Sequence, residues 1–375
     1  MSFESFDDQP LEDTVTTFNG SPPSTSAFPI EGVTLATGPS PFSKTLISIS
    51  GVILISIILL GNGLVILLLF RFRQLRTPTN YLILGMASAD FTTGIVLIAS
   101  LILRLKPEIR TTPKECLVFW SAGVFPGCTS VLTLLFVSLD RYLKVLLPLR
   151  YQTIMSNTVA IYSVACIYVY SAIAMFVLPW VGFNQTHKDF NIPCFFQLSK
   201  IFDPIYIQVL IYLNILLPLV LICFMYGHLF RVVMQKLSLE KIQGNPAALG
   251  IKYSRLSYLK REIKTIKTLV MLLGLCICGW VPVVCIVLAE IYNPGYQAGL
   301  GVRTIVGYLT FINSAINPIM YSLRSEQFRQ SARRMICGKQ SLKRHRLKRR
   351  DATVHPMSTF AISPLTKVNR SETIA

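Results

Sequence analysis

The amino-acid sequence predicts an all-α membrane protein, built as a bundle of seven membrane-spanning helices. Two observations predict this class. Of the 375 residues, 52% are hydrophobic and only 14% are charged, with a mean hydropathy of +0.54, whereas soluble domains carry about 25% charged residues. The chain also contains seven long apolar runs, each close to the ~20 residues that cross a bilayer. This composition excludes a disordered chain and disfavours a soluble enzyme.

The seven runs follow one another along the chain and carry almost no charge. The second run contains one acid, Asp90, and the fifth contains His228. Backbone polar groups find no water in hydrocarbon, so spans of this kind are expected to be helices. The expected spans are residues 46–70, 77–103, 116–139, 159–183, 204–230, 268–289 and 304–323. We find no internal repeat of the kind that builds transporters from duplicated halves.

The distribution of Lys and Arg predicts the orientation of the chain. Basic residues collect in the loops after the first, third and fifth spans and in the tail, and basic loops mark the cytoplasmic side. The loop after the second span also carries bases, but the total bias is clear. We therefore expect residues 1–43 to be an extracellular disordered stalk, 44–323 to be the membrane domain, and 339–375 to be a basic cytoplasmic tail.

Several residues outside the spans suggest modification. Asn19 and Asn184 begin glycosylation sequons on the expected outer side, although such sequons also arise by chance. Cys116 and Cys194 are both expected on the oxidising side, where a disulfide between them would persist. Cys337 follows the last span at the inner surface, as a palmitoylation site or as an ordinary reduced cysteine.

Polar residues inside the spans predict a functional site around Asp90. A charge in hydrocarbon is costly, so it is a functional-site hypothesis by default. Amide and hydroxyl side chains in the first, third and seventh spans can surround its carboxylate: Asn62, Ser130, Asn313, Ser314 and Asn317. Oxygen ligands of this kind suit a small hard cation. The alternative is a water-filled polar network that only locks the helices together.

The inner end of the third span carries a second group of interest, Asp140-Arg141-Tyr142. Arg141 can pair with Asp140 or with a carboxylate on another helix, for which Glu262 is the candidate. The alternative is simple snorkelling at the membrane interface. Prolines deep in three spans each remove a backbone hydrogen bond and are expected to kink their helices, as hinges or as static packing; they are Pro218, Pro282 and Pro318.

With these motifs in this order, the sequence resembles the rhodopsin-like (class A) G protein-coupled receptors over about residues 43–337. It looks like a divergent relative, nearest to the adenosine and amine receptor branches. The matching motifs are Gly61-Asn62, Ala87-Ser88-Ala89-Asp90, Asp140-Arg141-Tyr142, Pro218 with Tyr226, Trp280-Val281-Pro282, Asn317-Pro318-Ile319-Met320-Tyr321, and Phe328 with Cys337.

The resemblance implies a multi-pass plasma-membrane receptor with an amphipathic eighth helix over residues 324–338. Such a receptor converts binding of an extracellular ligand, here unidentified, into heterotrimeric G protein activation through outward movement of helix six. Arrestin, a receptor kinase and membrane lipid are the other expected partners. We expect no enzyme activity, nucleic acid or resident metal, and no cofactor beyond an allosteric sodium ion. The alternative is a constitutively active or partner-assembling orphan receptor without a small-molecule agonist.

The resemblance also assigns roles to single residues. A sodium pocket is implied for Asp90, Ser130, Asn313 and Ser314. G-protein coupling and an inner lock are implied for Asp140, Arg141, Tyr142 and Glu262. The activation switch would comprise Trp280, Pro282, Asn317, Pro318, Tyr321 and Tyr226. The family's outer disulfide falls on Cys116 and Cys194.

The sequence departs from the family's pattern at several places. Tyr168 replaces the helix-four tryptophan, Gly279 precedes Trp280, Cys276 lies one turn below it, and Pro126 is expected to distort helix three. In the ligand pocket, the position of the amine receptors' aspartate is a glycine, which disfavours a simple monoamine. A loop Phe-Gln pair resembles the adenosine receptors, yet two of their purine-binding positions differ. The pocket candidates are Gly123, Phe196, Gln197, Val287 and Phe311.

Overall fold

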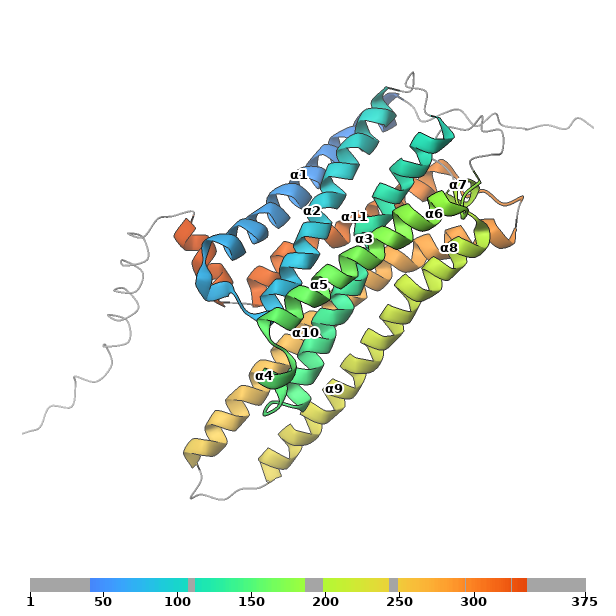
Figure 1. Ribbon diagram of the computed structural model, residues 1–375. Coiled ribbons are helices and arrows are strands. Elements are labelled where there is room, and N and C mark those ends of the chain that lie inside the picture. The colour runs from blue at the N-terminus through green and yellow to red at the C-terminus, as the bar shows by residue number, and fades with distance from the viewer. Residues whose placement is uncertain are drawn as a thin grey trace, which may run out of the picture. The chain divides into compact units, whose positions relative to one another are not determined.

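The computed structural model describes residues 41–106, 112–185, 198–242, 249–293, 295–324 and 326–335. The described residues from Ile47 onward form one compact unit, in which the long helices lie side by side as a bundle (Figure 1). Its uninterrupted long helices are α1 (Pro41–Arg71), α2 (Pro78–Leu105), α3 (Pro113–Leu146), α10 (Leu249–Tyr292) and α11 (Leu300–Arg324). Within the described ranges the only β pairing is an isolated bridge between Asn184 and Phe202.

The fourth and fifth spans are each composed of consecutive segments. The fourth consists of α5 (Asn157–Ala172), η2 (Ile173–Val177) and α6 (Leu178–Val181). The fifth consists of α8 (Pro204–Ile211), η3 (Tyr212–Leu216) and α9 (Leu217–Ile242). Short helical turns occur at η1 (Arg73–Leu75), α4 (Tyr151–Ile154) and α7 (Leu198–Ile201). Residues 326–335 are helical, within the range expected for the eighth helix.

The seven expected spans all lie in helices, which confirms the predicted fold class. Within the described ranges, six helices are long and apolar enough to cross a membrane: Thr45–Arg71, Pro78–Leu103, Pro113–Leu146, Asn157–Val181, Pro204–Leu239 and Ile266–Tyr292. The seventh, α11, has 25 residues, but its Asn313, Ser314 and Asn317 lower its hydropathy. Large apolar side chains also point outward from the bundle, among them Val220 and Ile305. Such exposure suits hydrocarbon surroundings rather than water.

Prolines shape the spans in two different ways. The π-helical turns η2 and η3 end two residues before Pro179 and Pro218, respectively. In each turn a backbone N–H reaches back five residues, from Leu178 to Ile173 and from Leu217 to Tyr212. A proline ring clashes with the carbonyl four residues before it, and the extra residue of a π turn relieves that crowding. The kink expected at Pro218 is therefore preceded by a π turn.

Three other prolines of the spans lie within continuous helices. Pro126 lies inside α3, Pro282 inside α10 and Pro318 inside α11. The distortion that we expected from Pro126 does not break α3, which runs unbroken for 34 residues. α3 packs against α2, α5 and α9, so it forms the centre of the bundle.

The helix-four departure from the family has a structural counterpart. The hydroxyl of Tyr168 donates to the Gly85 carbonyl at 3.0 Å and lies 2.7 Å from the Ser88 hydroxyl. A Cβ atom at Gly85 would lie 2.8 Å from the Val164 side chain. Glycine at this position therefore permits close packing of α2 on α5, and Tyr168 reinforces the contact with hydrogen bonds.

Candidate functional site

Asp90 lies fully buried in α2 and accepts hydrogen bonds from two other helices. Ser314 donates to its Oδ1 at 2.7 Å, and Ser130 donates to the same oxygen at 3.3 Å. Asn317 donates through Nδ2 to Oδ2 at 2.7 Å. These bonds satisfy a buried carboxylate that would otherwise be costly in a low-dielectric interior. The tertiary structure thus joins α2, α3 and α11 through one side chain.

Asn62 supports this pocket from α1. Its Nδ2 donates to the Ser314 carbonyl at 2.9 Å and to the Ile58 carbonyl at 3.0 Å. Proline at position 318 lacks the N–H that would normally bond to the Ser314 carbonyl, so Asn62 replaces that donor. The Asn62 Oδ1 is buried without a hydrogen-bond partner among the described residues. It is a spare acceptor in this polar region.

Asn313, which the resemblance also implies for the sodium pocket, packs against the α10 backbone at Gly279. None of the hydrogen bonds to Asp90 comes from Asn313, whose buried Nδ2 has no hydrogen-bond partner in the described part of the chain. A Cβ atom at Gly279 would lie only 2.4 Å from this nitrogen. Beside it, the Thr310 hydroxyl donates to the Gly279 carbonyl at 2.9 Å. The unusual Gly279 therefore permits a close approach of α10 and α11 at Asn313.

Trp280 follows Gly279 and packs on a second glycine. A Cβ atom at Gly127 of α3 would lie 2.7 Å from Cη2 of the Trp280 indole. The indole therefore rests against the α3 backbone, one turn above Ser130 of the Asp90 pocket. Cys276, which stands one turn below Trp280, is buried and is a free thiol.

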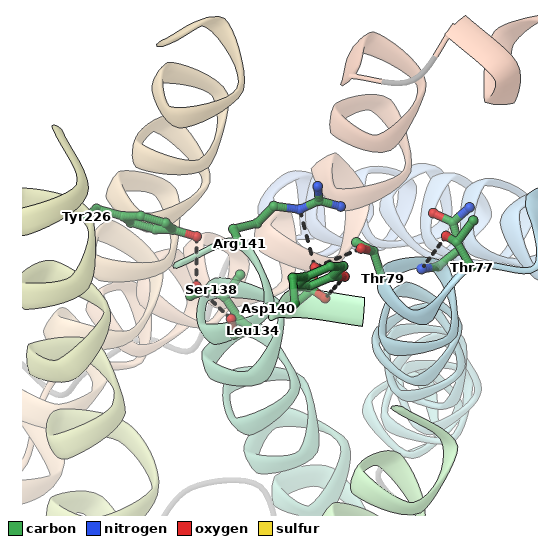
Figure 2. Close-up of polar contacts among 9 residues, drawn as sticks. Thr77, Thr79, Leu134, Ser138, Asp140, Arg141 and Tyr226 are labelled. Atoms are coloured by element: carbon green, nitrogen blue, oxygen red, sulfur yellow. Dashed lines mark hydrogen bonds and ion pairs between the residues drawn. The ribbon is translucent and has the colours of Figure 1, made fainter. Parts of the chain in front are cut away.

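The second polar cluster surrounds Asp140, near the C-terminal end of α3 (Figure 2). Asp140 is fully buried and lies between Arg141 and Thr79. Thr79 of α2 donates to Oδ2 at 2.7 Å, and the hydroxyl of Tyr151 in α4 donates to Oδ1 at 2.6 Å. The Arg141 Nε lies 3.5 Å from Oδ2. Arg141 thus pairs with its chain neighbour, which was one of the two acceptors that we considered.

Burial and the hydrogen bond to Asp140 raise the pKa of Tyr151 to about 12. Tyr151 lies between two spans, at the surface end of the bundle. At neutral pH its hydroxyl keeps its proton and remains a donor. The Asp140 carboxylate therefore holds α2, α3 and the connecting segment α4 together through two neutral donors.

The tyrosines named in the sequence are also engaged here. The Tyr226 hydroxyl of α9 lies 2.7 Å from the Ser138 hydroxyl of α3, and both residues are buried. The Tyr142 hydroxyl lies 3.0 Å from Nδ1 of His228. Both contacts join α3 to α9. Tyr321 of α11 is buried as well. The side chain of Glu262, the predicted partner of Arg141, lies outside the described residues.

At the opposite end of the bundle, Cys116 is disulfide-bonded, while the predicted partner Cys194 lies outside the described residues. Arg303 of α11 pairs with Glu290 of α10 at 2.6 Å, and Glu290 is 7% exposed in its side chain. The Arg303 Nε also donates to the Ala298 carbonyl at 2.9 Å. Arg303 is therefore held by an ion pair and a backbone carbonyl at this end of the bundle.

The predicted ligand residues are only partly described. A Cβ atom at Gly123 would meet nothing closer than a Val96 methyl carbon at 4.0 Å, so α3 leaves space there. Val287 is buried and Phe311 is half-buried. Asn184 donates through Nδ2, the atom that would carry a glycan, to the Pro179 carbonyl at 2.7 Å. Other predicted residues lie outside the described ranges: Asn19, Phe196, Gln197 and Cys337.

Sequence reasoning missed four residues that complete these clusters: Thr79, Tyr151, His228 and Glu290. One signal was available for Thr79, which precedes Asp90 by eleven residues, or about three helical turns, and so shares its face of α2. Tyr151 gave no such signal, because it lies in a separate turn whose position depends on tertiary packing.

Residues 61–321 match the family described as 7 transmembrane receptor (rhodopsin family). The histamine H2 receptor of Cavia porcellus is 28% identical over 300 residues, covering 78% of this chain and 80% of that receptor. The alpha-1A adrenergic receptor of Homo sapiens is 28% identical over 85% of this chain and 74% of its own. The adenosine receptor A2b of Bos taurus is 26% identical over 80% of this chain and 92% of its own.

Proposed function

The chain belongs to the rhodopsin family of seven-transmembrane receptors, and on this premise we propose that it is a plasma-membrane receptor that activates a heterotrimeric G protein when an extracellular ligand binds. G protein-coupled signalling follows from the family. The N-terminus lies outside in this proposal, because the basic loops mark the cytoplasmic side. A receptor kinase and arrestin then act on the cytoplasmic face.

The arrangement around Asp140 is the observation that supports this function most strongly. Asp140 already accepts two short hydrogen bonds, and Arg141 stands 3.5 Å away with 15% of its side chain exposed. The Arg141 Nε makes no hydrogen bond within the described residues. A guanidinium keeps its proton at any physiological pH. Arg141 is therefore a permanent cation, loosely held at the inner surface, and available to a carbonyl or carboxylate of the G protein.

Activation in this proposal moves the inner end of α10 away from α3 and α9. Thr310 holds α11 to α10 at Gly279, three residues before Pro282, so bending of α10 is expected at this level. Tyr226 must leave Ser138 before it can swing inward. Glu262 remains the predicted second acceptor for Arg141 in the resting state. Asn317, Pro318 and Tyr321 transmit the change from the Asp90 pocket.

The Asp90 pocket fits a sodium ion in its donor chemistry. Asp90 contributes a carboxylate, and Ser130 and Ser314 contribute hydroxyl oxygens that retain lone pairs. The buried Oδ1 of Asn62 is an unused acceptor nearby in the same network. When bound, a cation would supply positive charge beside the carboxylate. Asn313 stays a predicted member of this site, with its Nδ2 directed at Gly279.

The names of the relatives point to amine and adenosine ligands, but the pocket of this chain differs. Gly123 provides space and no charge where a cationic amine would need a carboxylate. Arg303 is engaged by Glu290 and Ala298, so it does not supply an anion site. We propose a ligand that is not a simple monoamine and that lies among Gly123, Val287 and Phe311, beneath the loop that carries Phe196 and Gln197.

The test is a reporter assay with a promiscuous G protein. Cells expressing the chain are measured in ligand-free medium and then with a ligand library, and Arg141→Ala is compared at matched surface expression. We expect output that Arg141→Ala abolishes. High output without ligand, unchanged by every compound, would support the constitutively active alternative. Output that survives Arg141→Ala would contradict the proposed role of Arg141.

A further inference from the structure

A crevice of about 250 Å³ lies where α1 ends and α2 begins. Its lining includes Leu69 and Phe70 of α1, Arg76 of the connecting turn, and Asn80, Tyr81 and Leu84 of α2. The crevice lies at the ends of the spans Thr45–Arg71 and Pro78–Leu103. It is therefore located at the membrane–water boundary, and none of its lining residues belongs to the Asp90 or Asp140 cluster, although Thr79 of the Asp140 cluster is the chain neighbour of Asn80.

The crevice combines an apolar wall with an open edge. Leu69 is buried and Leu84 is partly buried, whereas Phe70 is 65% exposed and points away from the bundle. The crevice therefore opens beside a side chain that faces lipid. Its volume is below the ~300–1,000 Å³ of pockets that enclose a whole small ligand, so its occupant would be one part of a larger molecule.

The edge of the crevice carries positive charge that no described acidic side chain pairs with. Arg71, Arg73 and Arg76 fall within six residues, and positions 69–84 contain no Asp or Glu. Arg76 uses one N–H on the Phe70 carbonyl at 3.2 Å, and its other guanidinium donors remain available. Asn80 uses Nδ2 on the Leu75 carbonyl at 2.7 Å, which leaves its amide oxygen and a second N–H.

The turn that connects α1 to α2 is also held by a hydrogen bond to the helix at 326–335. Gln74 donates through Nε2 to the Ser331 hydroxyl at 3.0 Å, and Ser331 is fully buried in the helix at 326–335. The arginine edge therefore belongs to a braced turn rather than to a free loop. Such preorganisation lowers the entropy lost when a ligand is bound.

We propose that this crevice binds an anionic phospholipid of the surrounding bilayer, with the phosphate at Arg76 and Asn80 and an acyl chain along Leu69 and Leu84. Basic pockets between membrane helices bind lipid head groups, and arginine is suited to phosphate. A soluble phosphate would leave the apolar wall unused, and a neutral sterol would leave the charge unused. The inference does not depend on G-protein coupling.

The test measures lipid retained by the purified full-length chain. The protein is exchanged into detergent with equal amounts of phosphatidylserine and phosphatidylcholine, and bound lipids are counted by native mass spectrometry. We expect selective retention of phosphatidylserine, reduced about fivefold in Arg76→Gln, which corresponds to the ~1 kcal/mol of one basic residue near anionic lipid. The matched control Arg73→Gln removes the same charge outside the lining and should change retention less than twofold.

Two further variants separate the crevice from general surface charge. Leu84→Phe keeps every charge and narrows the apolar wall, so it should also weaken phosphatidylserine retention. Arg76→Lys keeps the charge and should retain the lipid, which guards against a folding defect in Arg76→Gln. Equal losses in Arg76→Gln and Arg73→Gln, or full retention in Leu84→Phe, would overturn the proposal. Displacement by soluble glycerophosphoserine would overturn it in favour of a head-group site.

Discussion

Replacement of Tyr151 by Phe tests how the Asp140 cluster controls Arg141. The substitution keeps the ring and removes one hydroxyl, which donates to a fully buried carboxylate at 2.6 Å. In the resting state Asp140 still has Thr79 and the nearby Arg141. In the proposed active state Arg141 leaves, so Asp140 would keep only Thr79. The lost hydrogen bond therefore costs more in the active state, and the equilibrium should shift toward rest.

The size of the shift follows from the kind of bond that is lost. Hydrogen bonds to charged groups contribute about 1.5–3 kcal/mol. Arg141 can compensate for part of this in the resting state by moving closer than 3.5 Å. A differential of about 1 kcal/mol corresponds to a decrease of roughly fivefold in the population of the active state. The pKa of about 12 for Tyr151 makes this contribution insensitive to pH near neutrality.

The assay is ligand-independent G-protein signalling at matched surface expression. Tyr162→Phe is the matched control, because Tyr162 is 68% exposed and its hydroxyl has no hydrogen bond to any residue that the structure describes. Tyr151→Phe should lower basal output about fivefold, and Tyr162→Phe should leave it unchanged. Asp140→Asn should act in the opposite direction, because it removes the charge that holds Arg141. Unchanged or increased basal output in Tyr151→Phe would refute this reasoning.

Three further predictions concern other parts of the bundle. Cys116→Ser should reduce surface expression by breaking its disulfide, whereas the exposed free Cys166→Ser should not; normal expression of both would contradict a structural role for the bridge. Asp90→Asn should abolish the sodium dependence of basal nucleotide exchange, and a persisting dependence would leave only a polar network. Gly279→Ala should lower the melting temperature through overpacking against Asn313, at about 1–3 kcal/mol; Gly274→Ala in the same helix, with open space around it, should not, and equal melting shifts would refute the close-contact argument.

The sequence predicted the spans because their signal is local. Lipid requires every backbone group in a span to be paired within its own helix, so an uncharged run of about 20 residues reports its structure without knowledge of its neighbours. The same logic located the polar residues that lipid disfavours, beginning with Asp90 and Asn62. Helix lengths were less well predicted, because α10 begins at Leu249, in polar sequence that hydropathy does not identify as helical.

Which polar residues meet was decided only by the tertiary structure. Asn317 donates to Asp90, whereas Asn313, one turn earlier in the same helix, lies against Gly279. Both are asparagines of the seventh span, and only the rotation of α11 against α2 and α10 separates their roles. Tyr151 likewise reaches Asp140 because a turn after α3 folds back onto it. Arg303 of α11 is likewise paired with Glu290 of α10.

By itself, then, the sequence determined the positions of the apolar spans, their membrane environment and the list of polar residues that they carry, because each of these depends on local hydropathy and backbone pairing. The tertiary structure alone decided the partners: Thr79 and Tyr151 around Asp140, Asn62 on the carbonyl freed by Pro318, and glycines beneath Trp280 and Asn313. Such contacts depend on the rotation and close approach of whole helices, and these are set by the summed packing of the bundle rather than by any single segment.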